Sequence, residues 1–289
     1  IEIALNLTPI RTKEVEWDLG VTFSKNWSKV NKLWNEGDKP VTEYVLKTAY
    51  SANFVAKVGE PLGIFQVPAL ATVQDENSPY YGKVIVDANG IPTTSNSEMK
   101  TIGSSAPDFN MGFNTRVSYK GFTLSAVADW RKGGYMYSYT AQLMHFVGNT
   151  TRSLFNNREP FVVPNSVIAL KDGGYAENNR PVTSDNMSSY YSDSYPDSQF
   201  ENFIIPKGYV KLRELVLSYS FPKAWISKLG IQQLDLSLIG RNLFMWTPKA
   251  NNYVDPETTT FGNDIASELG EFAALPSTRN IGGGIKVVF

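Results

Sequence analysis

The stretch that decides the fold reads FNMGFNTRVSYKGFTLSAVADWR, residues 109–131. Apolar residues recur at alternate positions on both sides of Lys120-Gly121, and mostly polar residues fill the positions between them. A period of two is typical of a β-strand with one apolar face and one polar face. Because the two runs are separated only by Lys120-Gly121, the stretch predicts two antiparallel strands joined by a tight turn.

The same alternation recurs along the whole chain. We expect strands near residues 1–8, 13–27, 50–58, 63–67, 109–119, 121–137, 208–221, 231–244 and 279–289. In the segment 208–221 the apolar residues change face around Arg213 and Glu214, so this strand needs either a β-bulge or a different register. The sequence therefore predicts an all-β protein with about nine antiparallel strands.

An alternating sheet is compatible with two architectures. A soluble β-sandwich buries its apolar face against a second sheet, whereas an outer-membrane barrel turns that face to lipid and its polar face to a hydrated lumen. Strands of about ten residues can span a membrane. Phe122 and Trp130 lie on one face, roughly 26 Å apart at about 3.3 Å per residue, as a pair of aromatic girdles requires. We predict a barrel whose lumen is faced by Arg116, Asp129, Arg131, Asp235 and Arg241.

The lengths of the connections support this choice. Short links are expected at one end of the strands, and long external loops near 68–108, 143–207 and 245–278 at the other, which is the arrangement of outer-membrane barrels. About nine open strands would leave two unpaired edges. We therefore expect residues 1–289 to be the C-terminal part of a transmembrane barrel whose other strands precede Ile1.

Composition argues against several other classes of protein. The 27 Lys+Arg against 28 Asp+Glu give a net charge of −1, which carries no electrostatic footprint for nucleic acid. A single histidine and no cysteine exclude paired-His zinc sites and Cys–His catalysis. Neither a G-x-S-x-G elbow nor a phosphate-binding glycine motif occurs. We predict no enzymatic activity, no metal and no cofactor.

Tyrosines in the expected external loops are the candidate ligand-contacting residues. Aromatic rings stack on sugar rings and peptide side chains, and nearby amides and carboxylates bind hydroxyl groups. The alternative is an ordinary hydrated loop. The candidates are Tyr80, Tyr81, Tyr190, Tyr191 and Tyr195.

Several motifs resemble the SusC/RagA family of TonB-linked outer-membrane proteins. They occur in the family's order over nearly the whole chain, at 7–10, 17–20, 58–63, 119–125, 211–222, 240–246 and 255–257, at Pro276 with Arg279, and at the terminal Phe289.

The resemblance implies a barrel of about 22 strands with an N-terminal plug, in the outer membrane of a Gram-negative bacterium. It implies import of oligosaccharides or peptides, a SusD-like surface lipoprotein as lid, and energy supplied through TonB. The loop tyrosines would then contact cargo or lid, and Phe289 would be a barrel-assembly signal. The plug and the TonB box are not in this sequence. Two alternatives stay open: a passive porin-like channel, and a soluble β-sandwich that binds glycans.

Overall fold

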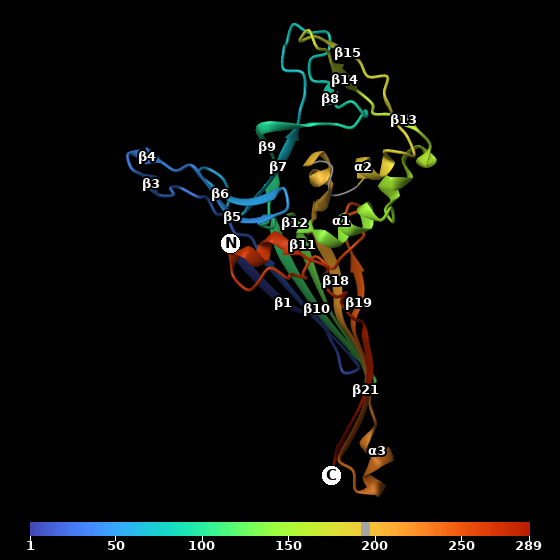
Figure 1. Ribbon diagram of the computed structural model, residues 1–289. Coiled ribbons are helices and arrows are strands. Elements are labelled where there is room, and N and C mark those ends of the chain that lie inside the picture. The colour runs from blue at the N-terminus through green and yellow to red at the C-terminus, as the bar shows by residue number, and fades with distance from the viewer. Residues whose placement is uncertain (192–196) are drawn as a thin grey trace.

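A long antiparallel sheet dominates the computed structural model, which describes residues 1–191 and 197–289. Within these residues the sheet has seven strands, in spatial order β1 (Glu2–Arg11), β2 (Val15–Ser24), β10 (Phe109–Tyr119), β11 (Phe122–Lys132), β18 (Tyr209–Ser220), β19 (Gln233–Trp246) and β21 (Asn280–Val288). Figure 1 shows these strands running side by side, with short links at one end and bulky insertions at the other.

The turn between β10 and β11 has the conformation that its sequence predicts. Lys120 and Gly121 have φ angles of 46° and 87°, and Tyr119 pairs with Phe122. Two consecutive residues with positive φ are characteristic of the type I′ hairpin turn, whose twist matches that of the flanking strands. The tight turn is confirmed.

Strand β18 contains the expected bulge, which brings Leu212 onto the same face as Leu215 and Leu217 and leaves Val216 on the polar face. Its pairing with β19 shifts between Leu212 and Glu214, and its pairing with β11 shifts between Val127 and Ala128. Relative to β11, the extra residue in β18 is Arg213. Because of the bulge, Arg213 and Glu214 both present their charges on the polar face, where they bind Asp129 and Arg241.

The register places most apolar side chains of the seven strands on one face; Val127, Val216 and Ile239 are exceptions on the polar face. Leu217 pairs with Leu238, and Leu236 pairs with Ile285, so apolar side chains continue from strand to strand. This face is open: Leu238 is 59% exposed and Ile285 is 73% exposed. A soluble sandwich would bury exactly these side chains against a second sheet, and the structure therefore contradicts the sandwich alternative.

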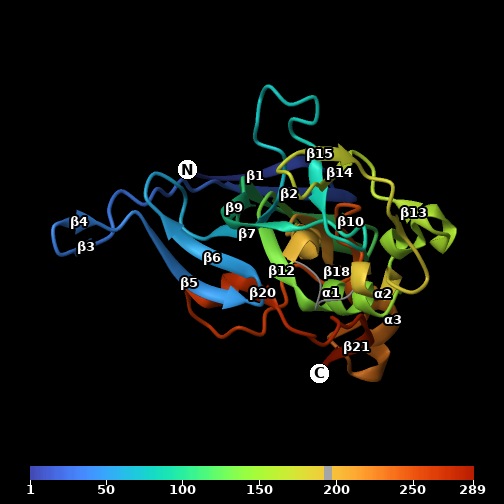
Figure 2. The same cartoon turned by 45° about the horizontal axis from the view of Figure 1, so that its top comes forward.

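Three long connections, residues 25–108, 133–208 and 247–279, extend from one end of the sheet (Figures 1 and 2). The first contains β3 (Asn35–Glu36), β4 (Lys39–Pro40), β5 (Glu43–Ala49), β6 (Ala52–Lys57), β7 (Ile64–Leu70), β8 (Val84–Val86) and β9 (Thr94–Ser104). The second contains β12 (Tyr135–Ser138), α1 (Tyr139–Phe146), η1 (Thr151–Arg158), β13 (Phe161–Val162), β14 (Ser166–Ala169), β15 (Tyr175–Glu177), β16 (Pro181–Val182), α2 (Met187–Tyr191), η2 (Asp197–Phe203) and β17 (Ile204–Pro206). The third contains η4 (Ile265–Leu269) and β20 (Gly270–Glu271).

The expected strands near 50–58 and 63–67 form, but they are not part of the long sheet. They are β6 and β7 of a separate four-stranded sheet, β5-β6-β7-β9, and β2 pairs directly with β10. The prediction of about nine strands in one wall was wrong in this respect. The physical reason is burial: Phe54 and Phe65 are completely buried, whereas a strand of the long sheet leaves its apolar face open.

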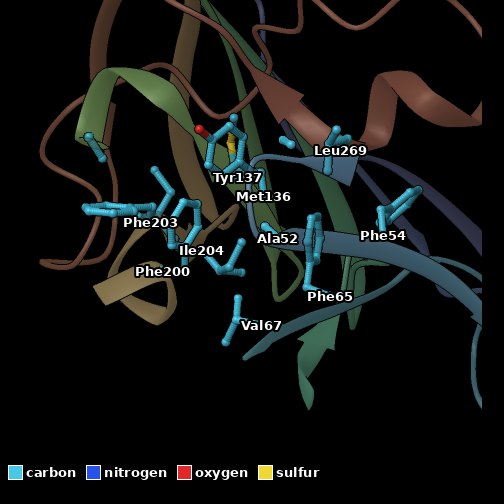
Figure 3. Packing of buried hydrophobic residues seen from close by; sticks show 13 residues of the cluster. Ala52, Phe54, Phe65, Val67, Met136, Tyr137, Phe200, Phe203, Ile204 and Leu269 are labelled. Carbon is cyan, nitrogen blue, oxygen red and sulfur yellow. The ribbon is translucent and has the colours of Figure 1, made fainter. Parts of the chain in front are cut away.

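The insertions share one hydrophobic core, which Figure 3 shows. Phe54 and Phe65 come from the first connection, Met136 and Phe203 from the second, and Leu269 from the third. The three long connections therefore pack as one body. Among the residues that the structure describes, no helix is both long enough and apolar enough to cross a membrane.

Candidate functional site

A network of charged side chains joins the polar face of the sheet to the third connection. Glu257 lies at its centre. Both oxygens of this carboxylate receive hydrogen bonds from Arg213, each at 2.6 Å. Tyr209 donates to it at 2.6 Å and Lys211 at 2.5 Å. Three side chains thus converge on one carboxylate through four hydrogen bonds.

Local structure explains why these groups meet. Tyr209 and Lys211 are two residues apart in β18 and therefore point to the same face. Arg213 follows Lys211 by two residues and lies on that face as well. Lys211 also binds Asp255 at 2.5 Å, and Arg213 binds Asp129 of β11 at 2.6 Å. The network therefore connects β11, β18 and the segment that follows β19.

Burial makes the pairing in this network obligatory. The side chains of Lys211 and Asp255 are 6% and 8% exposed, and a buried charge without a partner is strongly unfavourable. Burial raises the pKa of Glu257, but the hydrogen bonds from Arg213, Lys211 and Tyr209 outweigh it and lower that pKa to about 2. Nearby, burial lowers the pKa of Lys207, and its 2.7 Å bond to Glu268 opposes the shift.

A hollow of about 540 Å³ lies beside the network. It is lined by residues of five neighbouring strands and by Glu257; those on the polar face are Glu2, Ala4, Thr22, Ser24, Asn110, Gly112, Asp129, Tyr209 and Arg213. Hydroxyl, amide and charged groups line one trough across the sheet. Such a surface binds water and polar solutes. Among the described residues no group of three or more His, Asp or Glu side chains could hold a metal ion.

A second hollow, of about 720 Å³, gathers several of the motifs quoted from the sequence. Asn242 and Met245 come from the top of β19, Asp255 from the segment after it, and Pro276 and Arg279 from the segment before β21. The motifs that are scattered in sequence are therefore neighbours in space. They frame the end of the sheet from which the insertions extend.

The five charged residues predicted to face the lumen share the polar face of the sheet but do not form one site. Asp129 belongs to the network through Arg213. Arg131 donates to the backbone oxygen of Ser105 at 2.9 Å. The others are spread along the face: Arg116 is exposed opposite Asp18, Asp235 accepts from Gln233 at 2.7 Å, and Arg241 binds Glu214 at 2.9 Å.

The loop tyrosines differ in how much surface they offer. Tyr81 is 56% exposed, and Tyr80 lies next to it with Lys83 above its ring. Tyr191 is buried, stacks edge-on against His145 and donates to the oxygen of Arg152. The ring of Tyr191 is therefore covered by packing within the second connection and is not presented on the surface.

Of the remaining candidates, Tyr190 packs edge-on against Phe161 and Tyr191. Tyr195 lies outside the described residues. Phe289 is 78% exposed at the end of β21. The sequence reasoning missed Glu257 as a site residue, although its motif had been noted. The available signal was the pair Lys211 and Arg213 on one face of a strand, which requires nearby carboxylates.

Known proteins resemble this chain in both sequence and fold. No family model matches it. Its full length is 23% identical to TonB-dependent receptor P3 of Formosa agariphila, and it spans 28% of that receptor. Over 78% of its length it is 24% identical to the TonB-dependent receptor SusC of Bacteroides thetaiotaomicron, of which the match covers 20%.

The fold matches a solved structure described as that of the RagAB peptide transporter. The TM-score is 0.63 at 19% identity, and the match covers 99% of this chain and 28% of the other. These relatives are receptors and transporters and not enzymes. The resemblance indicated by the sequence motifs is thereby confirmed. In sequence and fold, the chain is thus similar to TonB-dependent receptors of the SusC/RagA type, and it spans about a quarter of their length.

Proposed function

We propose that this chain forms part of the wall and the outer loops of a closed outer-membrane barrel that imports oligosaccharides or peptides. The observation that carries the proposal is the two-faced sheet. Its apolar face is open across seven strands, and its polar face bears Arg116, Asp129 and Arg241. In lipid an open sheet edge is unfavourable, so further strands of a barrel of about 22 would close it.

The insertions fit the outer side of such a barrel. All three long connections leave the same end of the sheet and share one core, whereas the opposite end carries short links. Outer-membrane barrels place their long loops outside and their short turns in the periplasm. The five charged residues Arg116, Asp129, Arg131, Asp235 and Arg241 would then face the lumen. Tyr80 and Tyr81 would be available to cargo or to a lipoprotein lid of the SusD type.

Uptake by intact cells tests the proposal. A strain lacking the full receptor gene, and the same strain complemented with it, would receive fluorescent mixed oligosaccharides and, separately, mixed peptides. We expect the complemented strain to accumulate one of these classes, and an uncoupler of the proton gradient to abolish accumulation, because TonB transmits that energy. Accumulation that persists with the uncoupler would instead support a passive channel. No accumulation of either class would contradict the importer.

A further inference from the structure

The link between β18 and β19, residues 221–232, forms a small projection at the short-link end of the sheet (Figure 1). It contains α3 (Lys223–Ile226) and η3 (Ser227–Leu229), and Gly230, with a φ of 73°, caps η3. The amide of Phe221 donates to Leu234 at 2.9 Å, and the amide of Gln232 donates to Val288 at 2.7 Å. Both ends of the link are therefore fixed to the sheet.

The link buries one apolar side chain and exposes two. Ile226 is 3% exposed and holds the link in place, whereas Trp225 is 65% exposed and Leu229 is 72% exposed. The exposed tryptophan and leucine leave a large apolar area in contact with water. Residues with an apolar body are favoured at the boundary between lipid and water, and tryptophan most of all.

Ring contacts connect the link to the apolar face of the sheet. Phe122 and Tyr219, which pair across β11 and β18, have ring centroids 4.5 Å apart. Tyr219 contacts Phe221 at 5.0 Å, and Phe221 contacts Trp225 at 6.4 Å. A series of ring contacts thus leads from the apolar face of the sheet onto the link.

The charge of the link is entirely positive. Residues 221–232 contain Lys223 and Lys228 and no acidic residue. Both lysines are exposed, and neither forms an ion pair with any residue in the described part of the chain. Ammonium groups beside an apolar surface match the phosphate groups that border the acyl chains of a bilayer.

We infer that the link 221–232 is an interfacial membrane anchor. Trp225 and Leu229 lie in the boundary between headgroups and acyl chains of the periplasmic leaflet, and Lys223 and Lys228 contact phospholipid phosphates. The inference rests on the proposed function, since it requires the apolar face of the sheet to face lipid. It adds a lipid contact outside the strands, and it explains why Trp225 and Leu229 are exposed: their partner is phospholipid.

Site-specific fluorescence in the full receptor tests the anchor. The chain has no cysteine, so Leu229→Cys, Leu238→Cys and Tyr81→Cys each place one reactive thiol in it, with any cysteine elsewhere in the receptor replaced. Each variant would carry an environment-sensitive dye and be reconstituted into vesicles of phosphatidylethanolamine and phosphatidylglycerol. Quenchers attached to lipid near the headgroup, attached near the acyl end, or dissolved as iodide would then report depth.

We expect the label at residue 229 to lose most of its emission to the headgroup-proximal quencher, the label at 238 to the acyl-end quencher, and the label at 81 to iodide. If 229 responds to iodide as 81 does while 238 responds to lipid, the anchor is wrong and the proposed barrel stands. If 238 itself responds only to iodide, the proposed function fails and the anchor fails with it.

The lysines have their own test on the labelled Leu229→Cys receptor. Lys223→Gln with Lys228→Gln should weaken headgroup quenching at 229 in vesicles that contain phosphatidylglycerol, and should leave quenching at 238 unchanged in a parallel Leu238→Cys receptor. Quenching at 229 that does not respond to the two substitutions would overturn the role of the lysines. The labelled Leu229→Cys receptor, without the lysine substitutions, would also be mixed with unlabelled receptor. Loss of headgroup quenching at 229 on mixing would assign the surface to contact between two copies of the receptor and overturn the lipid assignment.

Discussion

Arg213 binds Glu257 through both terminal nitrogens of its guanidinium group, each 2.6 Å from a different carboxylate oxygen. The two residues are separated by 44 positions in sequence. One belongs to the bulge in β18 and the other to the segment that follows β19. This bidentate pair, together with Lys211 and Asp255, fixes the third connection against the polar face of the sheet.

Removing the charge of Glu257 should loosen that connection. Glu257→Gln keeps the size of the side chain but leaves Arg213 and Lys211 without their shared partner. We expect the local opening free energy of residues 250–260 to fall by about 2 kcal/mol, because hydrogen bonds between charged groups are worth roughly that much. Hydrogen exchange of the full receptor measures it. The control is Glu177→Gln, which breaks the exposed pair with Lys83 and should change local stability by less than about 1 kcal/mol. Equal effects of both variants would contradict the role of the network.

Protonation of His145, the only histidine, should destabilise the segment around α1 at acidic pH. Burial, and next the positive charge of Arg152, lower the pKa of His145 from 6.5 to about 4. Between these two pH values the unfolded segment therefore binds more protons than the folded one. The contribution of neutral His145 to local stability is fully present above pH 6.5 and declines as the pH falls towards 4. Hydrogen exchange of residues 139–150, corrected for the intrinsic rate at each pH, should show this decline. In His145→Gln the decline should disappear; the same decline in that variant would assign it to another group.

A methyl group at residue 270 should displace the third connection. Gly270 has a φ of 143°, and a Cβ there would lie 1.9 Å from the backbone oxygen of Tyr137. We expect Gly270→Ala to break the pairing of β20 with β12 and to lower local stability by at least about 2 kcal/mol. Gly173→Ala is the matched control: its φ is also positive, but its Cβ would meet no atom within 4 Å. Hydrogen exchange of residues 266–274 compares the two, and unchanged protection in Gly270→Ala would contradict the packing.

Charge should be tolerated on one face of β19 only. Leu238 and Ser237 are neighbours on opposite faces. In the proposed barrel, Leu238→Arg should cost about 2–4 kcal/mol, because it places a cation in the hydrocarbon, whereas Ser237→Arg points into the hydrated lumen and should cost much less. Denaturant titration of the full receptor in phospholipid vesicles measures both values. A larger cost for Ser237→Arg would reverse the assignment of the faces.

The two faces of the long sheet could be predicted from the sequence, because side chains two residues apart in a strand point to the same face. Leu234, Leu236 and Leu238 do share a face, and Asp129 and Arg241 lie on the other. The alternation of apolar and polar residues does not indicate which sheet a strand joins. Strand β6 alternates as the wall strands do, yet it is six residues long and buried, which is too short to cross a bilayer. The shortness of the neighbouring stretch expected at 63–67 was the available clue.

Other elements carried no such signal. Strand β9, TSNSEMKTIGS, lacks an apolar period and was expected to be loop. The meeting of Arg213 and Glu257 depends on a bulge and on the return of a distant segment, neither of which spacing reveals. Long-range ion pairs of this kind become visible only when the tertiary structure is known.

A depth scan along β19 tests the central claim most directly. Single cysteines at residues 234–239 of the full receptor, labelled with an environment-sensitive dye in phospholipid vesicles, would each be exposed to a quencher in the acyl chains and to iodide in water. The two-faced sheet predicts strict alternation: lipid quenching at 234, 236 and 238, and iodide quenching at 235, 237 and 239. The same response at all six positions, or iodide quenching at the leucines, would contradict a wall with lipid on one side and water on the other.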